Sequence, residues 1–88
     1  MQLDMTVYTA FNTNHEPLGD AGALDGAIEF VAGHNAVTAA DLATRPTGPR
    51  EDAVESWSVY RAADLESVGE DAPIVGFVRA TTEAATFG

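Results

Sequence analysis

The chain has 88 residues, enough for one domain but too few for a second hydrophobic core. Its 14 acidic residues and four arginines give a formal net charge of -10. That charge argues against direct binding to nucleic acid or to an anionic membrane, since both require clustered cationic side chains. The chain has no cysteine, which excludes disulfides, thiolate metal sites and cysteine nucleophiles.

The first residues carry neither the basic nor the apolar segment of a secretory signal. The longest strongly apolar run, Ile74–Val78, is far shorter than the roughly 20 residues that a membrane span needs. We therefore expect a cytoplasmic protein that makes no membrane contact.

The first twelve residues alternate with a period of two, which predicts a half-buried strand. The predominantly apolar face of this predicted strand consists of Leu3, Met5, Val7, Thr9 and Phe11. The other face consists of Asp4, Thr6, Tyr8, Ala10 and Asn12.

A turn and a helix are predicted next. Residues 12–19 are rich in turn formers, and Asp20 stands where the N-cap of a helix is expected. The predicted helix covers residues 21–32, and Gly33 is placed to end it. Its apolar stripe has helical spacing and consists of Leu24, Ala27, Ile28 and Val31.

A short second helix is indicated by Thr38 and Asp41, which have the spacing of a capping box. This helix is predicted over residues 39–43, and Pro46 is expected to end it. Residues 45–52 contain two prolines and a glycine and are predicted to form an exposed loop.

Two further strands are predicted over residues 54–62 and 73–82 from their β-branched and aromatic side chains. The connector, residues 63–72, is expected to form a helical turn that ends at Gly69. Residues 82–88 show no clear pattern and are expected to fray or to add an edge contact.

The predicted fold class is therefore α+β, with the order β-α-(short α)-β-β in one domain over residues 1–88. The simplest architecture is a three-stranded, mainly antiparallel sheet with the main helix on one face. The predicted core is thin because alanine supplies much of the apolar content, so a homodimer and a monomer both remain open.

A calcium loop is the first candidate for a metal site, because four potential oxygen ligands follow a spacing similar to that of an EF-hand. These ligands are Asn12, Asn14, Glu16 and Asp20. Pro17 stands where the loop needs glycine, and Ala23 stands where it needs a bidentate glutamate. We therefore expect no metal.

Catalytic patterns are equally weak. His15 and His34 belong to no metal-binding or acid-base motif, and Gly19, Gly22 and Gly26 do not have the spacing of a phosphate-binding loop. No activated nucleophile motif is present. We expect a protein without cofactor or enzymatic activity.

Aromatic side chains supply candidates for a protein interface. Trp57 and Val59 share one face of a predicted strand and are expected in the core. Tyr8 and Tyr60 lie opposite the apolar positions of their strands, so we predict them as interface residues.

Acidity is the feature of the sequence that says most about function. The chain has six acidic residues and no lysine or arginine before Arg45. A compact chain of this length is about 30 Å across, and B-DNA presents about 18 charges over that length. Fourteen carboxylates gathered on one side would approach this density. The predicted partner-binding residues are Asp25, Glu29, Asp64, Glu66, Glu70 and Asp71.

These features are similar in general character to small acidic DNA-mimic inhibitors, which include anti-restriction and anti-CRISPR proteins of phages and mobile elements. We therefore hypothesise a protein-binding module whose carboxylates occupy the basic groove of a nucleic-acid-binding protein. The alternative is a structural or oligomeric α+β domain whose acidity reflects a halophilic or GC-rich source. An edge strand, or Tyr8 and Tyr60, would then be its interface.

Overall fold

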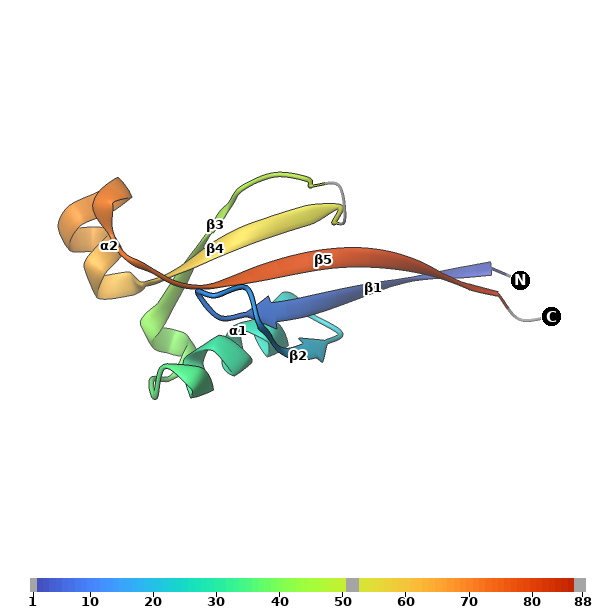
Figure 1. Cartoon of the computed structure of the whole chain (residues 1–88), viewed down its shortest axis with the longest axis horizontal. Helices are drawn as coiled ribbons and strands as arrows, with labels where there is room; N and C mark the ends of the chain where they lie inside the picture. The colour runs from blue at the N-terminus through green and yellow to red at the C-terminus, as the bar shows by residue number, and fades with distance from the viewer. Residues whose placement is uncertain (1, 51–52, 87–88) are drawn as a thin grey trace.

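The computed structural model describes residues 2–50 and 53–86, which form a five-stranded antiparallel sheet with one main helix (Figure 1). This confirms the α+β class and corrects the expected number of strands from three to five. The elements in chain order are β1 (Gln2–Phe11), β2 (Pro17–Ala21), α1 (Leu24–His34), η1 (Ala39–Asp41), β3 (Leu42–Pro46), β4 (Glu55–Arg61), α2 (Ala62–Val68), η2 (Gly69–Asp71) and β5 (Ile74–Thr86).

The strand order is β2-β1-β5-β4-β3, and every neighbouring pair is antiparallel. The long strands β1 and β5 pair along the whole of β1, from Gln2 opposite Thr86 to Phe11 opposite Phe77. The short strands β2 and β3 form the two edges of the sheet. The sheet is therefore organised around its first and last strands.

The segment around Asp20 is a strand and not the start of a helix. Residues 17–21 pair with β1, and Thr9 Oγ1 donates a hydrogen bond of 2.7 Å to Asp20 Oδ1. The helix α1 begins only at Leu24, after Ala23, which makes no side-chain cap hydrogen bond. The predicted N-cap at Asp20 is therefore wrong, because its carboxylate is used across the β1–β2 pair.

The capping box of Thr38 and Asp41 is confirmed. Asp41 Oδ2 accepts hydrogen bonds from the Thr38 backbone N–H at 3.2 Å and from Thr38 Oγ1 at 2.9 Å. The helix it caps is shorter than predicted, because Leu42 already begins β3 and pairs with Arg61 of β4. Arg45 lies in this strand and not in an exposed loop; the rest of the predicted loop includes residues 51–52, which lie outside the described residues.

The second half of the chain follows the prediction closely. Strands β4 and β5 fall where strands were expected, and α2 ends at Gly69, whose φ of 60° suits glycine. Residues 82–86 of the tail, expected to fray or to add an edge contact, belong to β5 and pair with β1. Residues 87–88 lie outside the described residues.

The core lies between α1 and the sheet face that carries Ala10. Its largest fully buried side chains are Val31 of α1, Val59 of β4 and Val78 of β5. Tyr8, which shares the face of Ala10, packs against this core. Val7, Thr9 and Phe11 of the predicted apolar face therefore lie on the face turned away from α1, contrary to expectation.

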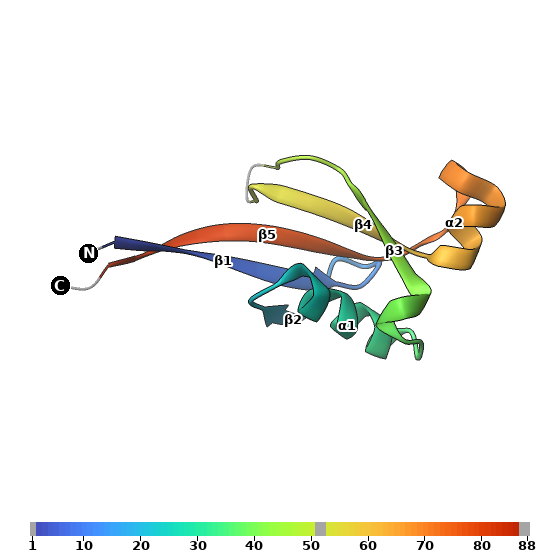
Figure 2. The ribbon, with the colours of Figure 1, turned by 180° about the vertical axis from the view of Figure 1, so that it is seen from behind.

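One end of the molecule is a two-stranded arm made by residues 2–7 of β1 and residues 81–86 of β5. Strand β2 pairs with β1 only from Tyr8 onward, and β4 pairs with β5 only up to Ala80. The arm projects away from α2, and the paired residues Gln2 and Thr86 lie at its tip (Figures 1 and 2). The principal extents of 52 × 23 × 21 Å reflect this elongated shape.

Candidate functional site

Four acidic residues gather on α2 and η2, at the opposite end of the molecule from the arm. We call them the α2–η2 carboxylates: Asp64, Glu66, Glu70 and Asp71. Glu66, Glu70 and Asp71 are exposed, and Asp64 is half-buried. They follow directly after β4, because the chain turns there through α2 and η2 before it returns as β5. Four acidic residues therefore lie close together in the chain beside one end of the sheet.

Other carboxylates have structural partners. Asp20 accepts from Thr9, Asp41 caps η1, and Glu16 Oε1 accepts from Asn12 Nδ2 at 3.4 Å. Among the described residues, no side-chain hydrogen bond of this kind is found for the α2–η2 carboxylates. The α2–η2 carboxylates can therefore bind a partner without breaking a side-chain hydrogen bond within the described fold.

The α1 carboxylates, Asp25 and Glu29, form a separate pair. Both are exposed and lie one turn apart on α1, whose buried residues Ala27 and Val31 face the core. Helices α1 and α2 lie apart in both views of the ribbon (Figures 1 and 2). The six predicted partner-binding residues therefore fall into two groups on different elements.

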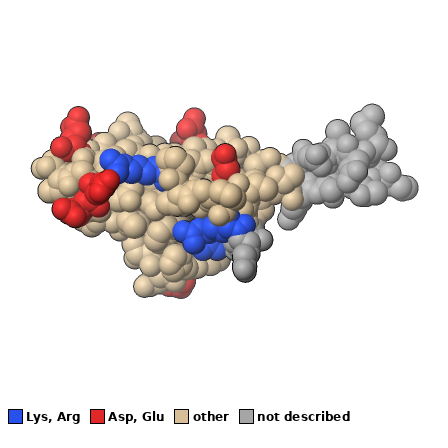
Figure 3. Space-filling view, turned by 90° about the horizontal axis from the view of Figure 1, so that it is seen from above, with Lys and Arg blue, Asp and Glu red and all other residues tan. Residues whose placement is uncertain are grey.

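Arginine side chains lie among the acidic residues. Arg61 is the last residue of β4 and directly precedes α2, so a positive charge adjoins the α2–η2 carboxylates. Figure 3 shows several acidic side chains at the end of the molecule where α2 lies, and arginine atoms on the same side of the surface. On this side, negative and positive side chains are interspersed.

Tyr8 and Tyr60 are both half-buried. Tyr8 packs against the core, and its ring centroid lies 5.9 Å from that of Trp57. Trp57 and Val59 belong to the core region as predicted. Tyr8 lies on the face of β1 that α1 covers, whereas the sequence pattern predicted the opposite face. The interface role of both tyrosines stays a prediction.

The segment with the EF-hand-like spacing begins with a turn that the Asn12 side chain stabilises. Asn12 Oδ1 accepts backbone hydrogen bonds of 2.9 Å from both Asn14 and Glu16, and the His15 ring stacks on Phe77 with centroids 4.7 Å apart. His34 is exposed in the last turn of α1. In the described ranges, no group of three or more His, Cys, Asp or Glu side chains is arranged to hold a metal ion.

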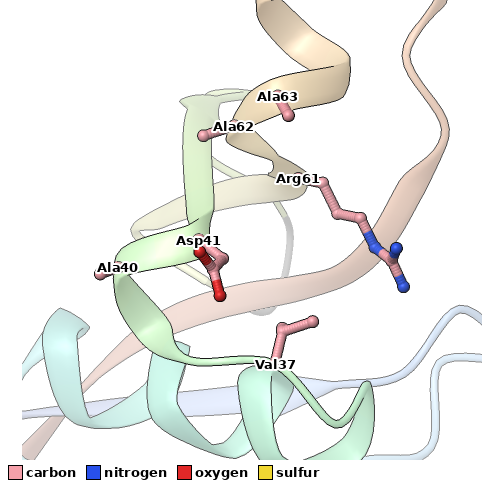
Figure 4. A pocket seen from close by; sticks show the side chains of 6 residues that line it. All are labelled: Val37, Ala40, Asp41, Arg61, Ala62 and Ala63. Carbon is pink, nitrogen blue, oxygen red and sulfur yellow. The ribbon is translucent and has the colours of Figure 1, made fainter.

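An open hollow of about 290 Å³ lies between η1 and the junction of β4 with α2 (Figure 4). Alanine side chains supply much of its lining, with one guanidinium and one carboxylate. Its lining residues are Val37, Ala40, Asp41, Arg61, Ala62 and Ala63. Sequence reasoning missed this hollow because two segments about 20 residues apart form it, and neither carries a recognisable motif.

Comparisons with known proteins return no match, whether to a family model, to a curated protein or to a solved structure. Within the part of the chain that the structure describes, no helix has the length and apolar character needed to cross a membrane. Inference about function therefore rests on the residues and the geometry described above.

Proposed function

We propose that this chain is a non-enzymatic module that binds a basic surface of another protein through the α2–η2 carboxylates. The observation that carries this proposal is their density, since four of the eight residues from Asp64 to Asp71 are acidic. Three of the four are exposed. Clustered negative charge attracts a basic partner over several ångströms and accelerates association.

The length and charge of the α2–η2 carboxylates indicate which kind of basic surface they can match. The seven residues of α2 span about 10 Å, and the three of η2 add about 6 Å. B-DNA presents about nine charges over the same length, so the four carboxylates supply less than half of that density. The group by itself is suited to a patch of a few arginine or lysine side chains.

Replacement of nucleic acid in a basic groove is the more concrete form of the proposal. It requires that the α1 carboxylates, Asp25 and Glu29, contact the same partner as the α2–η2 carboxylates. The two groups would then contact separate parts of one extended basic groove. This requirement makes the two forms of the proposal experimentally distinct.

The test uses purified basic nucleic-acid-binding domains, each bound beforehand to a fluorescent DNA duplex. We expect this chain to displace the duplex from at least one domain, with an affinity that falls as NaCl increases. The variant D64N/E66Q/E70Q/D71N should bind the same domain at least about tenfold more weakly, a loss of about 1.4 kcal/mol. Fluorescence anisotropy measures the displacement.

The matched variant D25N/E29Q removes the α1 carboxylates and leaves α2 unchanged. Weaker displacement by this variant supports nucleic-acid replacement, whereas unchanged displacement restricts the contact to the α2–η2 carboxylates. Charge reversal of Asp25 and Glu29 should leave the fold intact, because both are exposed. Binding that is insensitive to the four α2–η2 substitutions would contradict the proposal in both forms.

A further inference from the structure

The hollow between η1 and the junction of β4 with α2 has two walls that the sheet holds together. One wall consists of Ala40 and Asp41, and the other consists of residues 61–63. Leu42, which follows Asp41 directly, pairs with Arg61 in the β3–β4 ladder. Backbone pairing in the sheet therefore fixes how far apart the two walls lie.

Two opposite charges border this hollow without meeting. Figure 4 shows the Asp41 and Arg61 side chains on opposite sides of Val37. Neither charged group forms an ion pair with any side chain that the structure describes. Arg61 lacks such a partner although the chain has 14 acidic residues for four arginines. Each charge is therefore open to a ligand.

Both charged groups also have hydrogen-bonding capacity left. Asp41 Oδ2 accepts both bonds from Thr38, and among the described residues Asp41 Oδ1 accepts none. The Arg61 side chain is exposed, and a guanidinium can donate two parallel hydrogen bonds to one carboxylate. The hollow thus offers an acceptor for an ammonium group on one side and donors for a carboxylate on the other.

The surface between the two charges is apolar and small. It is lined by one valine and three alanines: Val37, Ala40, Ala62 and Ala63. Sites for drug-sized ligands have volumes of about 300–1,000 Å³, so a hollow of about 290 Å³ admits only a ligand of few atoms. A short hydrocarbon chain fits such a surface, because it would remove apolar area from water on both sides.

Electrostatics decides which small ligand is favoured. The net charge of -10 repels an anion, and the Arg61 guanidinium repels a cation at the hollow itself. A ligand that carries both charges and no net charge avoids both penalties and can pair with both side chains. The hollow is therefore complementary to a zwitterion.

We propose that this hollow binds a small amino acid whose ammonium group contacts Asp41 and whose carboxylate contacts Arg61. The hydrocarbon chain between the two charged groups then lies against the alanine side chains. The ligand is bound and released unchanged. The inference does not depend on what the α2–η2 carboxylates bind.

The first test titrates the isotope-labelled full chain with glycine, β-alanine and γ-aminobutyrate, whose charged groups lie progressively farther apart. We expect at least one of them to shift the backbone amide resonances of Val37, Ala40, Ala62 and Ala63. The dissociation constant should be on the order of 1 mM, because a ligand of few atoms makes few contacts. Acetate and methylammonium, which each carry only one of the charges, should bind at least about tenfold more weakly.

The second test removes each charge separately. R61Q and D41N should each raise the dissociation constant at least about tenfold. In D41N the side-chain oxygen can still accept from Thr38, so η1 keeps its cap. The matched variants R45Q and D25N remove the same charges from exposed positions on β3 and α1 and should bind as the wild type does. The dispersion of the amide resonances shows in the same spectra whether a variant folds.

Three results would overturn the inference. The first is the absence of shifts at the four amides with all three amino acids up to about 50 mM, well above the expected dissociation constant. The second is acetate or methylammonium binding as tightly as the amino acids. The third is an unchanged affinity in folded R61Q or D41N.

Discussion

Gly76 shows how tightly the helix and the sheet approach each other. A Cβ at this position would lie 2.7 Å from Val31 Cγ1 and 2.9 Å from the Phe11 carbonyl oxygen. Val31 is fully buried and Phe11 contributes backbone, so neither can move away cheaply. The absence of a side chain at Gly76 therefore allows α1 to pack at its observed distance from β5.

The substitution G76A should lower the free energy of unfolding by about 1–3 kcal/mol, because the added methyl overpacks this contact. Urea denaturation followed by circular dichroism measures the change. The matched control is G33A in α1, where a Cβ would meet nothing within 4 Å. This control should raise stability by up to about 1 kcal/mol, since alanine favours a helix. A G76A variant as stable as the wild type would show that α1 packs more loosely than described.

At the scale of the elements, Asn35 joins the end of α1 to the beginning of β5. Its Nδ2 donates to the Val31 carbonyl oxygen at 2.8 Å and to the Val75 carbonyl oxygen at 3.2 Å. One side chain thus caps the helix and connects it to a strand 40 residues later. The contact helps to determine where α1 lies on the sheet.

We expect N35A to lower the free energy of unfolding by about 1–3 kcal/mol, the loss of two hydrogen bonds at about 0.5–1.5 kcal/mol each. Thermal unfolding together with urea denaturation would measure this loss. N14A is the appropriate comparison, because Asn14 is exposed and the hydrogen bond it donates comes from its backbone N–H. Similar losses in N35A and N14A would argue against the role of Asn35.

At the scale of the whole molecule, the chain is elongated and carries a large net negative charge. The radius of gyration is 13.9 Å, compared with about 12 Å expected for a compact chain of this length. The arm accounts for the elongation, because it extends beyond the part of the sheet that α1 covers (Figure 2). Repulsion among surplus carboxylates opposes compaction in such a molecule.

Salt should therefore stabilise the folded chain. Raising NaCl from about 10 mM to about 150 mM shortens the Debye length from about 30 Å to about 8 Å, which screens this repulsion and should raise the melting temperature. In the variant E66K/E70K, each substitution changes the charge by two, so the net charge goes from -10 to -6. Calorimetry should find a smaller salt effect in this variant. An equal effect would mean that the α2–η2 carboxylates contribute little to the repulsion.

Features that depend on a few neighbouring residues were determined by the sequence alone. The Thr38–Asp41 capping box, the helix end at Gly69 and the strands β4 and β5 have local physical causes: side-chain capping, a left-handed φ and β-branched side chains. The acidity of residues 64–71 is likewise visible in the sequence. These features were predicted because no distant segment is needed to produce them.

Tertiary structure decided the remaining features, because they depend on which distant segments meet. Residues 17–21 include proline, glycine and aspartate, which disfavour strands, yet they form β2 because the edge of β1 supplies hydrogen-bonding partners. Because of this pairing, the Asp20 carboxylate accepts a hydrogen bond from Thr9 and does not cap a helix. The position of α1 places Tyr8 and Ala10 on the covered face of β1, and the separation of α1 from α2 divides the acidic residues into two groups. Alternation within one strand shows that its faces differ, but only packing determines which face is buried.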